Sequence, residues 1–264
     1  MNIRKGLKVA CGVFAINPPA FYNNLRGIPA FFKDWGEIRK QRRSEAAADF
    51  ALRMNYPCLG DRYDSAGKMS GHYFHQDLHV SQRIFRANPV RHIDIGSRID
   101  GFVAHVAAFR EIEVFDIREV QSTSPNIRFR CADLMRMPEG MENYCDSISS
   151  LHAIEHFGLG RYGDPIDWNG HLKALRNITK ILRGGGTFYF SVPVGPQRIE
   201  FNAHRVFAIK YLLALFEKDY ELRQFSYVDD AGDFHENVRL TENAVAENFG
   251  CVYGCGLFEL YKRP

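Results

Sequence analysis

Polar residues able to hold a nucleotide-like ligand stand at the ends of four short apolar segments of this sequence. Short apolar runs bounded by turn residues indicate buried strands of a parallel sheet. The carboxyl ends of such strands meet at one edge of an open α/β sheet, where ligands bind. The segments and their polar residues are 90–95 with Asp94, 113–115 with Asp116, 127–130 with Asp133, and 145–150 with His152.

Two of these carboxylates stand where they could contact an adenosine. Asp116 lies 116 − 94 = 22 residues after Asp94. An acid about 20 residues beyond the first turn holds the ribose hydroxyls in nucleotide-binding βαβ units. Asp133, at the third strand end, can accept a hydrogen bond from an adenine amino group. The alternative is that each aspartate simply caps a strand end, as in any α/β fold.

A glycine turn follows the first segment, in the run Asp94-Ile95-Gly96-Ser97-Arg98. Gly96 allows a sharp turn and a close approach of the backbone to a ligand, and a helix over 99–109 would point its N-terminal amides there. A dinucleotide fingerprint needs a second glycine where Arg98 stands, and a Walker loop needs a G-K-[ST] ending that is missing. The turn therefore favours a cationic amino-acid ligand without a pyrophosphate, with an ordinary strand-to-helix turn as the alternative.

The segment after the fourth strand, His152-Ala153-Ile154-Glu155-His156, carries the catalytic candidates. An imidazole titrates near neutrality and could take the proton of a substrate hydroxyl. The segment also matches the H-x-x-E-H pattern of a zinc peptidase class, but that chemistry needs both histidines on one helix, and here a strand precedes them. Packing and helix capping remain an alternative for Glu155 and His156. We predict His152, Glu155 and His156 as catalytic residues and assign no metal ligand.

Two later loops and one earlier segment supply candidates for substrate contact. Loop 157–169 is glycine-rich and of a length that suits a lid, and 196–205 could bind sugar hydroxyls or a phosphate through its arginines; a solvated connection is the alternative. Histidines 72, 75 and 79 are either substrate or metal groups or polar edges of a packed helix over 76–87. The predicted substrate-binding residues are Arg161, Tyr162, Arg198, His204 and Arg205.

Composition limits the class of protein. The chain has 264 residues, 45% of them hydrophobic, and a formal net charge of +3 with no polybasic block, so nucleic acid is not an expected partner. Its six cysteines form no C-x-x-C pair and no export signal is evident, which indicates reduced thiols and a cytoplasmic protein. The apolar run 9–16 is too short to span a bilayer, which allows at most a peripheral membrane contact.

The chain divides by pattern into a helical cap over residues 1–88 and an α/β domain over 89–264. In the first part, prolines at 18, 19 and 29 are expected to break the chain before a helix over 33–54. In the second part, strands and helices alternate regularly through a fifth strand over 187–192. Strands over 222–228 and 257–261 are expected to close the sheet as an antiparallel hairpin at its edge.

Taken in order, Asp94-x-Gly96, Asp116, Asp133, the strand ending at Ser150 and the turn Leu182-Arg183-Gly184-Gly185 resemble the class I S-adenosylmethionine-dependent methyltransferases, over roughly 89–194. The whole chain also resembles an uncharacterised family first named from nematode proteins, whose bacterial members are found among surface-polysaccharide genes. The segments that carry this second resemblance are Gly71–Asp77, Leu151–Asp167 and Phe201–Arg205.

The resemblance implies a Rossmann-like fold, S-adenosylmethionine as cofactor, and O-methylation of a saccharide or other small molecule, in polysaccharide biosynthesis. Two alternatives are a non-catalytic binding protein that keeps the fold, favoured by Arg98, and an NAD-dependent nucleotide-sugar enzyme, disfavoured by the missing glycine. The resemblance places the methionine end at Asp94, Gly96 and Ser97, the ribose and adenine at Asp116, Ile117, Asp133 and Leu134, and the reactive sulfonium near Ser150 and His152.

Overall fold

The structure is a computed structural model that describes residues 17–44, 50–121 and 123–264. The chain forms two units, residues 1–68 and 69–264. This division lies earlier than the boundary expected after residue 88, because helix α3 (His72–Ala87) packs in the second unit, where Val80 and Ile84 are buried in its core. That the first unit caps the second stays a prediction, and the apolar run 9–16 lies outside the described residues.

Within its described residues, the first unit has a long helix, α2 (Pro18–Ser44), and a short 3-10 turn, η1 (Asp61–Tyr63). The expectation that the prolines break the chain, with a helix only from residue 33, is wrong. Pro18 and Pro19 occupy the first turn, where a backbone N–H has no partner within the helix, and Asn17 Oδ1 accepts a hydrogen bond from Ala20 N at 3.1 Å. Pro29 lies inside the helix.

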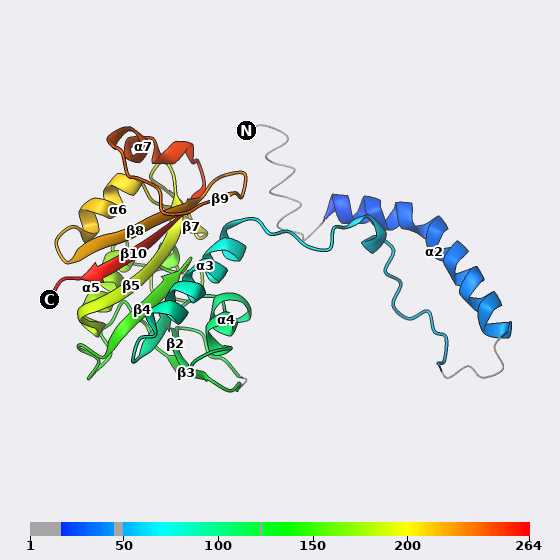
Figure 1. Ribbon diagram of the computed structural model, residues 1–264, viewed down its shortest axis with the longest axis horizontal. Helices are drawn as coiled ribbons and strands as arrows, with labels where there is room; N and C mark the ends of the chain where they lie inside the picture. Colours follow the sequence, from blue (N-terminus) through cyan, green and yellow to red (C-terminus); the bar gives the residue numbers. More distant parts are fainter. Residues whose placement is uncertain (1–16, 45–49, 122) are drawn as a thin grey trace. The chain divides into compact units, whose positions relative to one another are not determined.

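The second unit is built on an eight-stranded sheet with the order β3-β2-β1-β4-β5-β10-β8-β9 (Figure 1). Strands β1 to β5 are parallel, and β10 runs antiparallel to both of its neighbours, β5 and β8. The strands are β1 (His92–Ile95), β2 (Ile112–Asp116), β3 (Ile127–Cys131), β4 (Cys145–Leu151), β5 (Leu182–Val194), β8 (Tyr220–Val228), β9 (Phe234–His235) and β10 (Gly254–Lys262).

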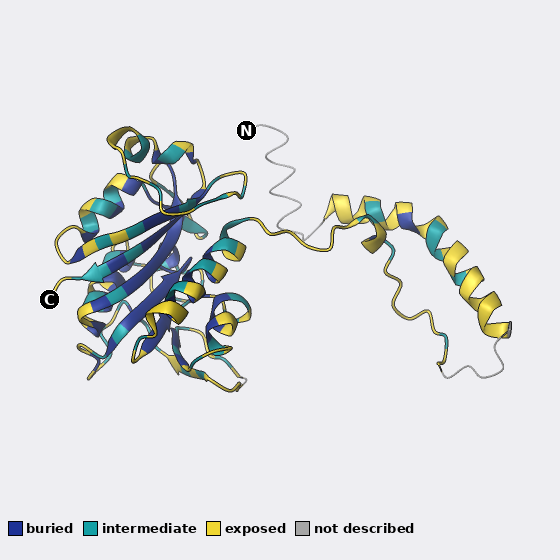
Figure 2. Ribbon diagram, in the orientation of Figure 1, coloured by how far each residue is buried: buried dark blue, intermediate teal, exposed yellow. Residues whose placement is uncertain are grey.

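Helices cover both faces of this sheet. On one face, α5 (Gly170–Ile181) and α6 (Ile209–Phe216) pack on aromatic residues of β5 and β10. On the other face, α3 packs with the π-turn η2 (Ile99–Val103) and α4 (Ala104–Ala107). Figure 2 shows the central strands buried along their length. The shorter elements are η3 (Ile154–His156), β6 (Arg198–Glu200), β7 (His204–Val206), α7 (Glu242–Ala246) and η4 (Asn248–Gly250).

This architecture is the Rossmann-like fold of the class I methyltransferases, as predicted. The parallel strands were located to within a few residues because buried strands between turns have a clear apolar pattern. The helix expected over 99–109 is instead a π-turn followed by one turn of α-helix, so it is shorter and less regular. Among the described residues, no helix is both long and apolar enough to cross a membrane.

Candidate active site

A cavity of about 910 Å³ opens at the carboxyl ends of the parallel strands in the second unit. Its position is the one that open α/β sheets use for ligands. Most of the residues predicted from the sequence meet here. Those that line it are Gly96, Ser97, Asp116, Ile117, Asp133, Leu134, His152, Glu155, His156, Arg161, Tyr162 and His204.

Asp94 lies beneath the first turn and does not line the cavity. Its side chain is fully buried and accepts hydrogen bonds from Ser97 N at 3.0 Å, Ser97 Oγ at 2.6 Å and Ser149 Oγ at 2.5 Å. Gly96 has a φ of 70°, a conformation that favours glycine. Asp94 therefore shapes the turn that faces the cavity, and it reaches a ligand only through Ser97 and the backbone.

Burial raises the pKa of Asp94 to about 6, although its three hydrogen bonds lower it. Between about pH 4 and 6 the folded chain binds a proton that the unfolded chain has released, so the free energy of unfolding falls as the pH rises. Asp94→Asn removes this titration. Between pH 4 and pH 7, the free energy of unfolding of the variant should therefore rise relative to that of wild type by about 2.4 kcal/mol. Urea unfolding of both proteins across this range measures the gain, and parallel pH profiles would contradict the assignment.

The ends of β2 and β3 present two aspartates with different partners. Asp116 is paired with Arg118 at 2.7 Å, and the Arg118 guanidinium also lies 4.2 Å from the ring centroid of Tyr162. Asp133 accepts a hydrogen bond from Met135 N at 2.9 Å, and its other oxygen lies 3.9 Å from Arg136 Nε. Both carboxylates are thus placed by local bonds at the edge of one cavity.

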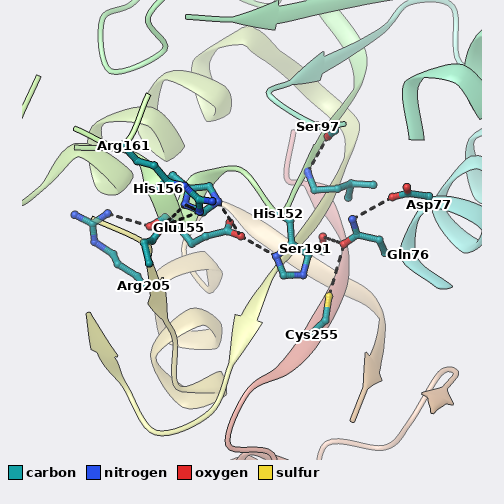
Figure 3. A network of polar contacts seen from close by, with 12 residues as sticks. Gln76, Asp77, Ser97, His152, Glu155, His156, Arg161, Ser191, Arg205 and Cys255 are labelled. Atoms are coloured by element: carbon teal, nitrogen blue, oxygen red, sulfur yellow. Dashed lines mark hydrogen bonds and ion pairs between the residues drawn. The ribbon is translucent and has the colours of Figure 1, made fainter. Parts of the chain in front are cut away.

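The end of β4 carries a buried group of three ionisable side chains. His152 has a φ of 52°, and its N–H donates to Ser191 O at 2.9 Å, which fixes the residue where strand becomes loop. His152 Nδ1 lies 2.7 Å from Glu155 Oε1, and His156 Nε2 lies 3.7 Å from the same oxygen. His156 Nδ1 donates to Ala203 O at 2.6 Å. Figure 3 shows Glu155 between the two imidazoles.

The electrostatics of this group favour a charged pair. Burial disfavours the charged form of His152, but its interactions with Cys255 and Glu155 raise its pKa well above the usual value. Burial also raises the pKa of Glu155, and the attraction of His152 outweighs this and lowers it. The pKa of His156 is lowered, chiefly by burial. His152 is therefore held and oriented by a carboxylate, as in catalytic pairs of this kind.

Arg205 was predicted to bind substrate, but the structure uses it to hold the loop around the site. It is 4% exposed, and its guanidinium donates to Phe157 O at 2.6 Å, Trp168 O at 3.2 Å and Glu155 O at 3.4 Å. Burial lowers its pKa. The carbonyl groups of Glu155, Phe157 and Trp168 thus share one buried cation, and Arg205 does not line the cavity.

Two further predicted residues also lie off the cavity. Ser150 is fully buried and donates to Ile95 O at 2.9 Å, so it joins β4 to β1. Arg198, on β6, pairs with Glu200 at 2.8 Å and donates to Val252 O at 3.1 Å. An arginine in a predicted loop and a serine at a strand end have no sequence signal that separates a structural role from a binding role.

The structure adds site residues that the strand ends did not indicate. Tyr73, Arg118, Asp164 and Tyr253 line the cavity. His72 stacks on His152, with ring centroids 5.2 Å apart, although the sequence left its role open between ligand and packing. Tyr73 lies on helix α3, which precedes the first parallel strand, and Tyr253 lies immediately before β10; neither belongs to a local motif.

Solved structures with this fold include two that resemble the chain along most of its length. The [4+2]-cyclase SpnF is 14% identical, with a TM-score of 0.51 over 71% of this chain and 81% of that protein. The 1,6-didemethyltoxoflavin-N1-methyltransferase of Burkholderia thailandensis, solved with 1,6-didemethyltoxoflavin and S-adenosylhomocysteine, is also 14% identical, with a TM-score of 0.50 over 71% of this chain and 79% of its own. At this identity the likeness concerns the fold.

Sequence comparison assigns the family more directly. No curated protein matches the chain. A family model described as Caenorhabditis protein of unknown function, DUF268, matches residues 113–247, which are 135 of 264 residues and include β2 to β8 and the His152 segment. The nematode-named resemblance seen in the sequence is thereby confirmed, and the chain belongs to this family, on a class I methyltransferase fold.

Proposed function

We propose that this protein is an S-adenosylmethionine-dependent methyltransferase that acts on a hydroxyl group of a small molecule. One observation carries the proposal: a single cavity is lined both by Gly96, Asp116 and Asp133 and by the His152–Glu155 pair. The first three residues stand where the fold holds an adenosyl ligand, and the pair stands where an acceptor would meet it.

The residues around the first turn fit the cofactor. A Cβ on Gly96 would lie 3.1 Å from the Cβ of Ala153, so the turn is tight and the backbone can approach a ligand. Arg98 replaces the second glycine of a dinucleotide motif, and its side chain is held at the surface by Asp100 at 3.0 Å and by the Tyr73 ring at 4.8 Å. The methionine end would then lie against Gly96 and Ser97.

The adenosine would lie across the ends of β2 and β3. Asp116 would hold the ribose hydroxyls, and the apolar side chains of Ile117 and Leu134 would flank the adenine, with Asp133 at its edge. Arg118 forms an ion pair with the Asp116 carboxylate, but the Arg118 side chain is 53% exposed and can rotate away from it. A ribose would replace one set of hydrogen bonds to this carboxylate with another.

When bound, S-adenosylmethionine supplies a methyl group on a positively charged sulfur. The chain must then align the acceptor with that group and remove the proton of a hydroxyl acceptor. His152 lines the cavity, and Glu155 orients it through Nδ1. Because its pKa is raised, His152 must first lose the proton on Nε2, and this nitrogen can then take the proton of the acceptor. Burial of the pair excludes water from it.

The acceptor side of the cavity suits a saccharide. Tyr162, His204 and Tyr253 bring aromatic rings to the wall, and Arg161 and His156 bring hydrogen-bonding groups. Aromatic faces and polar edges together suit a sugar, which has both apolar C–H surfaces and hydroxyls. We therefore propose O-methylation of a saccharide or a similar small molecule, in surface-polysaccharide biosynthesis.

Cofactor binding gives the direct test. S-adenosylhomocysteine should raise the melting temperature of the protein through linkage, and NAD should not. Asp116→Ala should weaken S-adenosylhomocysteine binding more than tenfold, about 1.4 kcal/mol or more, because a charge-assisted hydrogen bond is lost. Glu119→Ala, three residues further along the same cavity wall, is the matched control and should bind almost as wild type. Calorimetry measures both.

A stabilising shift with NAD and none with S-adenosylhomocysteine would reverse this assignment. The Asp116–Arg118 ion pair favours one other candidate, a binding protein that keeps the fold without catalysis. A screen of sugars and nucleotide sugars for release of S-adenosylhomocysteine separates the two, because only an enzyme releases the product.

A further inference from the structure

One imidazole nitrogen of a histidine that lines the cavity is buried without a hydrogen-bond partner. His152 Nε2 has no partner among the described residues, although the side chain is only 4% exposed. Within the same small space lie ligand atoms of His72 and Cys255, and the three atoms are all within 4.8 Å of one another. A buried polar atom left unpaired is costly, so this arrangement calls for an occupant.

The three side chains are ligands that zinc prefers. Zn²⁺ is bound in proteins by imidazole nitrogens and thiolate sulfurs at about 2.0–2.3 Å, and three protein ligands leave one position of the tetrahedron open. In such a site the ligand atoms are about 3.3–3.6 Å apart. The present cluster would close by about an ångström, with a rotation of the His72 ring, which now lies nearly parallel to that of His152 at 12°.

The second nitrogen of His152 is already held as in a metal site. Metal-binding histidines usually donate their other N–H to a carboxylate, which fixes the ring and raises its basicity. His152 Nδ1 lies 2.7 Å from Glu155 Oε1, and Glu155 is 1% exposed. Nδ1 is therefore occupied by the carboxylate, and Nε2 is left for the ion.

A thiol nucleophile is the main rival role for this cluster, because cysteine, histidine and glutamate also form catalytic triads. Cys255 is fully buried at the start of β10, where its backbone pairs with Pro193 and Val228. A substrate in the cavity has no access to such a sulfur. A single metal ion is small enough to bind between the three side chains without a substrate-sized opening, so the burial of Cys255 favours a metal site.

We propose that His72, His152 and Cys255 bind a Zn²⁺ ion, with Glu155 as the outer partner of His152. This differs from the sequence prediction, which assigned no metal ligand. Ion binding does not depend on methyl transfer. Its role in the reaction does rest on the proposed function: with an ion on Nε2, His152 is a ligand and no longer a base, and the ion would acidify the acceptor hydroxyl instead.

The test measures the metal in the full-length protein. Protein purified without chelator is analysed for metal content, and chelator-treated protein is titrated with Zn²⁺ and with Co²⁺ as a spectroscopic probe. We expect about one ion per chain and a thiolate-to-Co²⁺ charge-transfer band. Cys255→Ser should abolish the band and lower Zn²⁺ affinity at least tenfold, and Glu155→Gln should lower affinity about 10- to 100-fold.

Matched variants keep the test sharp. Cys251→Ser changes a buried cysteine four residues away, and His171→Gln changes a buried histidine outside the cluster; both should keep the ion. The zinc site and the proposed methyltransferase activity are tested independently, because metal content is measured without substrate or cofactor. Equal metal binding by wild type and Cys255→Ser would overturn the site, as would no binding by wild type. Rapid alkylation of Cys255 in Zn²⁺-saturated protein would instead support the thiol role.

Discussion

Replacing His152 by alanine should lower turnover by about 10²–10⁴-fold, the usual contribution of a group that removes a proton in the transition state. Affinity for S-adenosylhomocysteine should stay within a few-fold of wild type, because the imidazole is not needed for the adenosine. Single-turnover kinetics with an acceptor found in the screen, and calorimetry with S-adenosylhomocysteine, measure the two quantities. A loss follows whether Nε2 takes the proton itself or holds the ion.

The control for this experiment is His171→Ala. His171 is also a buried histidine, with Nε2 3.4 Å from Tyr211 Oη, but it lies away from the cavity. The His171→Ala substitution should lower the stability of the protein and leave turnover per folded molecule nearly unchanged. Should His152→Ala behave like His171→Ala, then His152 packs in the core and has no part in the chemistry.

Replacing Arg205 by methionine should destabilise the second unit by about 2–4 kcal/mol. Methionine fills a similar volume but leaves the carbonyl groups of Glu155, Phe157 and Trp168 without the donor that they share. Arg198→Met, on the neighbouring strand β6, is the matched control: its ion pair with Glu200 is partly exposed, so the cost should stay below about 1 kcal/mol. Urea unfolding of the two variants measures the difference.

Turnover offers a second readout for Arg205. Because the guanidinium holds the carbonyl groups of Glu155 and Phe157, its loss should also loosen the backbone that positions Glu155. Turnover per folded molecule should therefore fall in Arg205→Met and not in Arg198→Met. Equal stability of the two variants would mean that the loop finds other donors, and that Arg205 is dispensable.

Much of the fold could be predicted because its strands are short, apolar and bounded by turns. The positions of Asp116, Asp133 and His152 followed from that pattern, and the structure brings them to one cavity. Asp94 and Ser150 were correctly placed at strand ends, but their side chains turn into the sheet. A sequence pattern locates a strand end to within a residue or two; it does not show which side of the turn a side chain faces.

The remaining part of the site could not be predicted because it is contributed by distant segments. His72 begins helix α3. Tyr253 lies immediately before β10 and Cys255 at its start, both more than a hundred residues beyond the first parallel strands. These residues lie close together because of the order of the strands in the sheet, and no local sequence pattern predicts that order. Arg205 shows the same limit: an arginine side chain is usually exposed, and only the three carbonyl partners of Arg205 reveal that it is structural.

The place of β10 in the sheet has a consequence for how the protein is made. This strand lies between β5 and β8, yet it is synthesised after every other strand of the sheet. Until it emerges from the ribosome, β5 and β8 each present an open edge, a template for wrong pairing with other chains. The sheet of the nascent chain therefore stays incomplete between β5 and β8 until β10 is synthesised. Insertion of this last strand completes the sheet and places Cys255 beside His152.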